Sequence, residues 1–165
     1  MIRMRYFSLV LIALTLLVFG NGLASADPTV SKVQVLSAID AFQKDPASKD
    51  GFAAAATIMS FAKTSPLVHI SLSKSVAPWL TDKDASDADT RTILLSAYVA
   101  GNVDAQLKSG KPVDDVYSGW EQVLTTYAQL LHINSAAKIQ EVEELREKDE
   151  HGELRAYAAE VAGEK

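Results

Sequence analysis

The stretch from Val113 to His132 carries the clearest periodic pattern in this sequence. Its large apolar residues recur at alternating steps of four and three, the spacing of one face of an α-helix. They are Val116, Trp120, Val123, Tyr127 and Leu130. A helix with such a face must bury it against other elements, and no stretch shows the strict alternation typical of a strand. The sequence therefore predicts an all-α protein, either a compact bundle or a stack of helical hairpins.

Weaker helical spacing elsewhere raises the expected total to about six or seven helices. Ile93 to Leu107 is apolar nearly all round, which predicts a central helix buried on most sides. In the helix expected after Pro46, Phe52, Ala55, Ala56 and Met59 are predicted to share one side. The remaining expected helices are Val30 to Phe42, Pro46 to about Lys63, Leu67 to about Ser75, Ile139 to about His151, and Leu154 to Val161.

The first 26 residues have the layout of a secretory signal peptide. Arg3 and Arg5 precede an apolar run from Tyr6 to Phe19, and Ala24-Ser25-Ala26 supplies the small residues that a signal peptidase reads. Cleavage is expected between Ala26 and Asp27. The alternative is a retained membrane anchor, but the apolar run is shorter than the roughly 20 residues of a spanning helix. The domain division is therefore a signal peptide at 1–26 and one helical domain at 27–165.

Charge and cysteine content restrict the partners and the chemistry of the exported chain. Without Arg3 and Arg5, 14 basic side chains face 21 acidic ones, a net charge of about −7. Such a chain repels nucleic acid and anionic lipid, so neither is expected as a partner, and no membrane contact is expected after cleavage. The chain has no cysteine, which excludes disulfides and thiol chemistry. These features favour a bacterial protein of the periplasm or one that is secreted.

The sequence contains only partial matches to motifs for metals, phosphates and nucleophiles. Asp82, Asp84 and Ser86 resemble the first half of a calcium loop, but Asp87 replaces its glycine and Ile93 its final glutamate. Gly110-Lys111 lacks the rest of a phosphate loop, and no Gly-x-Ser-x-Gly elbow is present. The histidines at 69, 132 and 151 form no metal motif, although Glu147 and His151 could share a helix face. We expect no catalytic residue, no metal and no cofactor.

Two further features have both a structural and a functional interpretation. Acidic residues between Glu141 and Glu150 form either a solvated outer face or a docking surface for a basic partner. Trp120 belongs to the periodic face and is expected in the core. Trp79 follows Pro78 outside any clear stripe. It either closes the end of the bundle or projects as an anchor for a partner, because exposed tryptophans are common at binding hot spots.

The stretch from Leu94 to Leu131, with Ala97-Tyr98, Gly101-Asn102, Gly119 and Tyr127, resembles a tetratricopeptide-type helical hairpin. The connection from Asp104 to Pro112 is longer than that family's turn, and no second copy follows at the family's period. The resemblance implies a groove that binds peptides or proteins, without catalysis.

Two functions remain open from the sequence. The first is an exported, non-catalytic helical module that binds a protein partner or assists a process of the cell envelope. The second is a small-ligand-binding helical protein with an apolar pocket between the central helix and the Trp120 helix, since bundles build sites between facing helices. An enzyme is the least favoured interpretation. A closed core with an exposed groove favours the first, and an internal cavity with converging polar groups favours the second.

Overall fold

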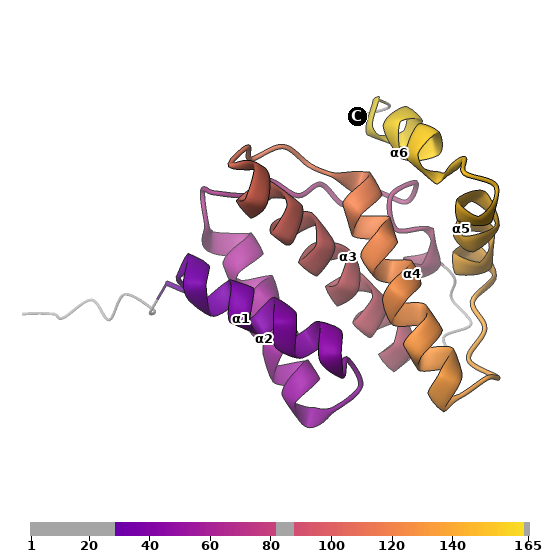
Figure 1. Ribbon diagram of the computed structural model, residues 1–165, viewed down its shortest axis with the longest axis horizontal. Helices are drawn as coiled ribbons and strands as arrows, with labels where there is room; N and C mark the ends of the chain where they lie inside the picture. The colour runs from indigo at the N-terminus through magenta and orange to yellow at the C-terminus, as the bar shows by residue number, and fades with distance from the viewer. Residues whose placement is uncertain (1–28, 82–87, 164–165) are drawn as a thin grey trace, which may run out of the picture.

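A computed structural model describes residues 29–81 and 88–163, and within these ranges every regular element is helical. The chain thus has the predicted all-helical architecture (Figure 1). The α-helices are α1 (Lys32–Lys44), α2 (Lys49–Thr64), α3 (Ala88–Ser109), α4 (Val116–Ile133), α5 (Gln140–Glu150) and α6 (Leu154–Gly163), and η1 (Pro78–Leu80) is a 3-10 turn. The predicted signal peptide, its cleavage position at Ala26 and Asp27, and the aspartates of the calcium-like loop lie outside the described residues.

Helix α3 occupies the centre, as its apolar sequence predicts. The α1–α2 hairpin packs on one side of it and α4 on the other, and α5 and α6 cover the far side of α4 (Figure 1). Local side chains fix where the helices begin. Ser31 and Gln34 form a reciprocal capping box at α1, Ser48 caps α2, and Asp115 caps α4.

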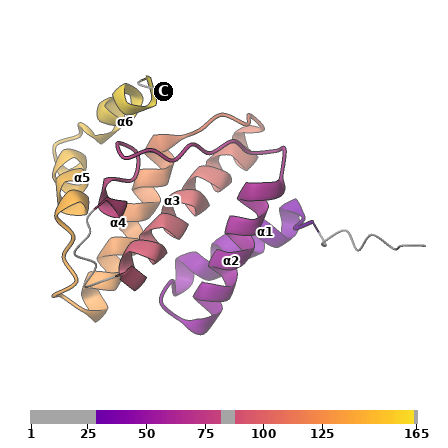
Figure 2. The same ribbon diagram turned by 180° about the vertical axis from the view of Figure 1, so that it is seen from behind.

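The predicted helix from Leu67 to Ser75 is wrong. Residues 65–77 instead run as an irregular segment across the ends of α3 and α4, linking α2 to η1 (Figure 2). Side chains of α3 and of the α3–α4 connection bond to backbone groups of His69 and Ser71 in this segment. The amide of His69 donates to Gln106 Oε1 over 2.8 Å, and Gln106 Nε2 donates to the His69 carbonyl over 2.8 Å. These partners replace the bonds that a helix would have made within the segment.

The face that α2 buries is also rotated from the predicted one. Its buried residues are Gly51, Ala54, Ala55, Ile58 and Phe61. Phe52 and Ala56, predicted on the same side as Ala55, are exposed instead. The run Ala53 to Ala56 gave the pattern too little contrast to define the orientation, because alanine suits either side of a helix.

Helices α3 and α4 approach each other through two glycines. A Cβ atom at Gly101 would lie 2.4 Å from the carbonyl oxygen of Ser118, and one at Gly119 would lie 2.5 Å from the ring of Tyr98. Backbone and ring therefore fill the space at this crossing. The pocket predicted between the central helix and the Trp120 helix has no room there.

Replacing Gly119 by alanine is expected to lower the free energy of unfolding by about 1–3 kcal/mol, the usual cost of overpacking a filled interior. The Tyr98 ring is fully buried, so it has no free space into which to move. Gly163→Ala is the matched control, because nothing lies within 4 Å of a Cβ atom there. Urea unfolding of both variants measures the difference, and equal midpoints would show that the helices are not in such close contact.

Candidate functional site

Trp79 lies in the core. Its side chain has 0% exposed surface, and Arg91 donates a hydrogen bond to its backbone carbonyl. The sequence left two roles open for Trp79, a plug at the end of the bundle or an exposed anchor. The buried ring agrees with the first role, and it lies where η1 contacts α5. A partner anchor needs accessible surface, which Trp79 lacks in this structure.

The other sequence candidates do not converge on one site. Among the described residues, no group of three or more His, Asp or Glu side chains could hold a metal ion. The imidazole Nδ1 of His151 lies 2.7 Å from the backbone oxygen of Glu147, so the ring contacts the peptide group there. On α5, Glu144, Glu147 and Glu150 are exposed while Val142 and Leu145 face the core.

A buried polar network was not foreseen from the sequence. It joins α3 to segment 65–77 and to the start of α4 through Tyr98, Asn102, Gln106 and Asp114. Asn102 Nδ2 donates to Asp114 Oδ1 over 2.6 Å, Gln106 Nε2 donates to Asn102 Oδ1 over 2.5 Å, and the Ser71 amide donates to Asp114 Oδ2 over 3.0 Å. Burial, together with the charge of Asp114, raises the pKa of the Tyr98 hydroxyl well above its usual range. Because its groups pair with one another, the network is a structural clamp.

Alkaline pH should reveal this burial. Burial also raises the pKa of Tyr127 to about 12. A tyrosine whose pKa is higher in the folded protein than in the unfolded chain stabilises the fold. This stabilisation is complete below the unfolded pKa of about 10 and is lost as the pH rises toward the folded pKa. We expect the melting temperature to fall above about pH 10, because the unfolded chain ionises first. Tyrosinate absorbance should show Tyr98 and Tyr127 titrating later than an ordinary tyrosine. Tyr127→Phe should remove one of them, and normal titration of every tyrosine would contradict the structure.

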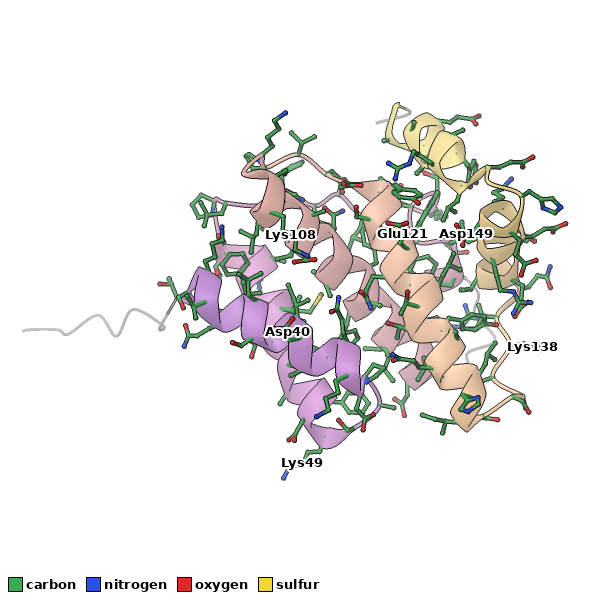
Figure 3. The ribbon with its side chains drawn as sticks, viewed as in Figure 1. Asp40, Lys49, Lys108, Glu121, Lys138 and Asp149 are labelled. Atoms are coloured by element: carbon green, nitrogen blue, oxygen red, sulfur yellow. The ribbon has the colours of Figure 1, made fainter. Side chains whose placement is uncertain are left out.

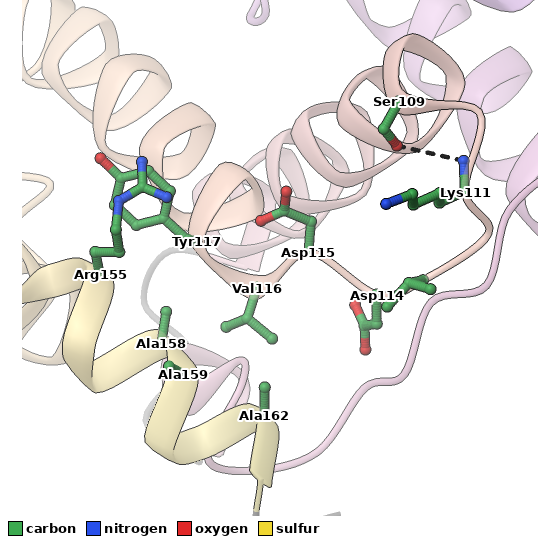
Figure 4. A pocket seen from close by; sticks show the side chains of 11 residues that line it. Ser109, Lys111, Asp114, Asp115, Val116, Tyr117, Arg155, Ala158, Ala159 and Ala162 are labelled. Atoms are coloured by element: carbon green, nitrogen blue, oxygen red, sulfur yellow. Dashed lines mark hydrogen bonds between the residues drawn. The ribbon is translucent and has the colours of Figure 1, made fainter.

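A surface pocket of about 360 Å³ lies between the α3–α4 connection and α6 (Figure 4). Lys111 extends into it toward Asp115, and the guanidinium of Arg155 lies over the Tyr117 ring at 3.7 Å from its centroid. Asp115 accepts a hydrogen bond from the Ser118 amide over 3.0 Å as the cap of α4. The pocket is polar on one side and lined by small α6 residues on the other: Ala158, Ala159 and Ala162.

A second surface feature is more extended, and we name it the apolar face. It consists of three hollows in series, of about 210, 510 and 560 Å³. The first two share Met59 and the last two share Leu72, so they form one continuous surface. Its large exposed side chains are Phe52, Leu72 and Leu80, with 47%, 51% and 41% of their surface accessible. Helices α1, α2 and α3, segment 65–77 and the residues around η1 supply its lining.

The apolar face differs from the rest of the surface in charge. Residues 51–81 contain no aspartate or glutamate, although the whole chain has 21, and their only Lys or Arg residues are Lys63 and Lys74. Both lysines line the hollows. Elsewhere the charged side chains are spread widely: those labelled in Figure 3 come from α1 to α5 and from the α4–α5 connection. The sequence signal of this face is thus a long stretch without carboxylates in an acidic chain.

Comparison with known proteins gives no relative. No family model, no curated protein and no solved structure matches this chain. The tetratricopeptide-type resemblance of residues 94–131 therefore stays a prediction, although α3 and α4 do lie side by side as a helical hairpin. Within the described residues, no helix combines the length and the apolar character required to cross a bilayer. Over residues 29–81 and 88–163, the molecule is all-helical and carries an extended apolar face.

Proposed function

We propose that this protein is an exported, non-catalytic helical module that binds a partner protein through the apolar face. The observation that carries the proposal is the continuity of the three hollows between Phe52 and Leu80. Large apolar side chains lie half-exposed along it, whereas the core beneath is filled by buried residues such as Ile58 and Phe61. Contiguous apolar surface of this kind marks interaction sites in soluble proteins.

Capture from an envelope extract tests the proposal. The tagged protein should retain a partner that the double variant Phe52→Ser/Leu72→Ser loses. The matched control is Val113→Ser/Ile133→Ser, which removes two apolar side chains that are 66% and 72% exposed and lie off the apolar face. Retention of the same proteins by all three forms would contradict the proposal.

Export is part of the same proposal, and it rests on residues 1–26. The exported protein should begin at Asp27, because Ala24 and Ala26 occupy the small-residue positions before that bond. Intact-mass measurement checks this. A membrane-bound form that retains Met1 to Ala26 would show instead that the segment is an anchor.

A small-ligand-binding role is the alternative function. The pocket of about 360 Å³ beside Lys111 and Arg155 favours it, since its size lies within the range of ligand sites, about 300–1,000 Å³. Thermal-shift screening of small molecules, repeated on Arg155→Ala, separates this role from partner binding. A ligand that stabilises the protein but not the variant would support it.

A further inference from the structure

We infer that the apolar face receives an amphipathic helix of a partner protein, and that this helix carries acidic residues beside its apolar stripe. The inference rests on the proposed function and names the chemistry of the partner. It draws on the shape of the face, on its two lysines and on the charge of the surrounding molecule.

The shape of the face suits a helix. Along α2, Phe52, Ala56 and Met59 line the first hollow, and Lys63 follows Met59 at the next helical step. Thr92, Ile93 and Ser96 of α3 form the facing wall. Ala55 and Ala56 are small residues in the same hollow and allow close approach. Helix-in-groove recognition uses apolar anchors at such spacing.

The charge of the face selects an acidic helix. Lys63 lines the middle hollow and Lys74 the last, and none of the described residues that line the three hollows carries a carboxylate. Neither lysine forms an ion pair within residues 29–81 and 88–163. The exported chain has a net charge of about −7, so an acidic helix is repelled by the molecule as a whole, whereas the two lysines attract it at this face. Such complementarity gives orientation and specificity.

A second copy of the chain is a poorer occupant. In a two-fold dimer the same patch meets itself, so the lysines of both copies would share one interface. Like charges brought together in this way oppose association. Self-association is therefore an outcome that the experiment must detect, and it would overturn the inference.

Two designed helical peptides test the inference directly. Both carry leucine at the same helical spacing, and the polar positions hold glutamate in one peptide and lysine in the other. Fluorescence anisotropy of the labelled peptides gives their dissociation constants with the full protein. We expect the glutamate peptide to bind at least about fivefold more tightly than the lysine peptide, from two exposed charge contacts.

Variants assign the binding to the face. Phe52→Ser/Leu72→Ser should raise the dissociation constant of the glutamate peptide at least about tenfold, because two apolar anchors are lost. Lys63→Glu/Lys74→Glu should reverse the preference between the two peptides. Lys111→Glu/Lys138→Glu is the matched control, since it makes the same change of charge away from the face and should keep the original order. Sedimentation of the unliganded protein monitors self-association.

The contradicting results are separable. Equal binding of both peptides, lost in Phe52→Ser/Leu72→Ser, would overturn the acidic partner but leave the apolar face as a binding surface. Binding of neither peptide, or binding unchanged by those substitutions, would overturn the docked helix. In that case the capture experiment still decides the proposed function. A dimer abolished by Leu72→Ser would identify a second copy as the occupant.

Discussion

Trp120→Ala is expected to fold poorly or not at all. The indole is fully buried in α4, its Nε1 donates to the carbonyl of Val76 over 2.7 Å, and its ring stacks on Tyr157 of α6 with centroids 5.3 Å apart. Emptying a large aromatic position costs about 3–5 kcal/mol, out of the 5–15 kcal/mol roughly available to a domain. The loss would separate segment 65–77 and α6 from the centre of the bundle at the same time.

Chemical unfolding followed by circular dichroism measures this effect. Glu144→Ala is the control, because the side chain is exposed on α5 and its removal should change the free energy of unfolding by less than about 0.5 kcal/mol. If the two variants unfolded at the same denaturant concentration, the orientation of α4 in the bundle would be wrong.

Trp79→Ala is the second variant expected to lose about 3–5 kcal/mol of stability, by the same large-to-small reasoning. Its ring has no accessible surface and lies where η1 contacts α5. Removing it leaves a cavity at the point where segment 65–77 returns to the bundle.

Leu80→Ala, one residue further on, is the control for Trp79. Leu80 is 41% exposed on the apolar face, so its truncation should affect stability far less. Thermal melts of the two variants give the comparison. If Trp79→Ala left the melting temperature unchanged, Trp79 would not be a core residue and would again be a candidate for binding a partner.

Most of the helical architecture could be predicted from periodicity. The apolar stripe through Trp120 oriented α4, and the apolar character around Ala97 and Tyr98 predicted that α3 is central. Prolines at 46 and 66 follow the ends of α1 and α2, because the residue before a proline avoids helical geometry. These signals are local, and local signals are what a single sequence expresses best.

Features that depend on distant residues could not be predicted. Within the non-helical stretch 67–75, the backbone of His69 and Ser71 is hydrogen-bonded by Gln106 and Asp114, more than thirty positions away. The polar network was hidden for the same reason, since Asn102 and Gln106 look like polar interruptions of an apolar helix. The apolar face was missed because Phe52 was placed on one side with Ala55, and only the packing of α2 on α3 shows that Phe52 is exposed.

Site-specific photo-crosslinking in the cell tests the central claim, that the apolar face binds a partner. A crosslinking residue is placed at Leu72 in one form and at Ile133 in another, two exposed apolar positions of which only the first lies on the face. We predict a discrete protein adduct at position 72 that disappears with Phe52→Ser, and none at position 133. No adduct at position 72, or the same adducts at both positions, would contradict the claim.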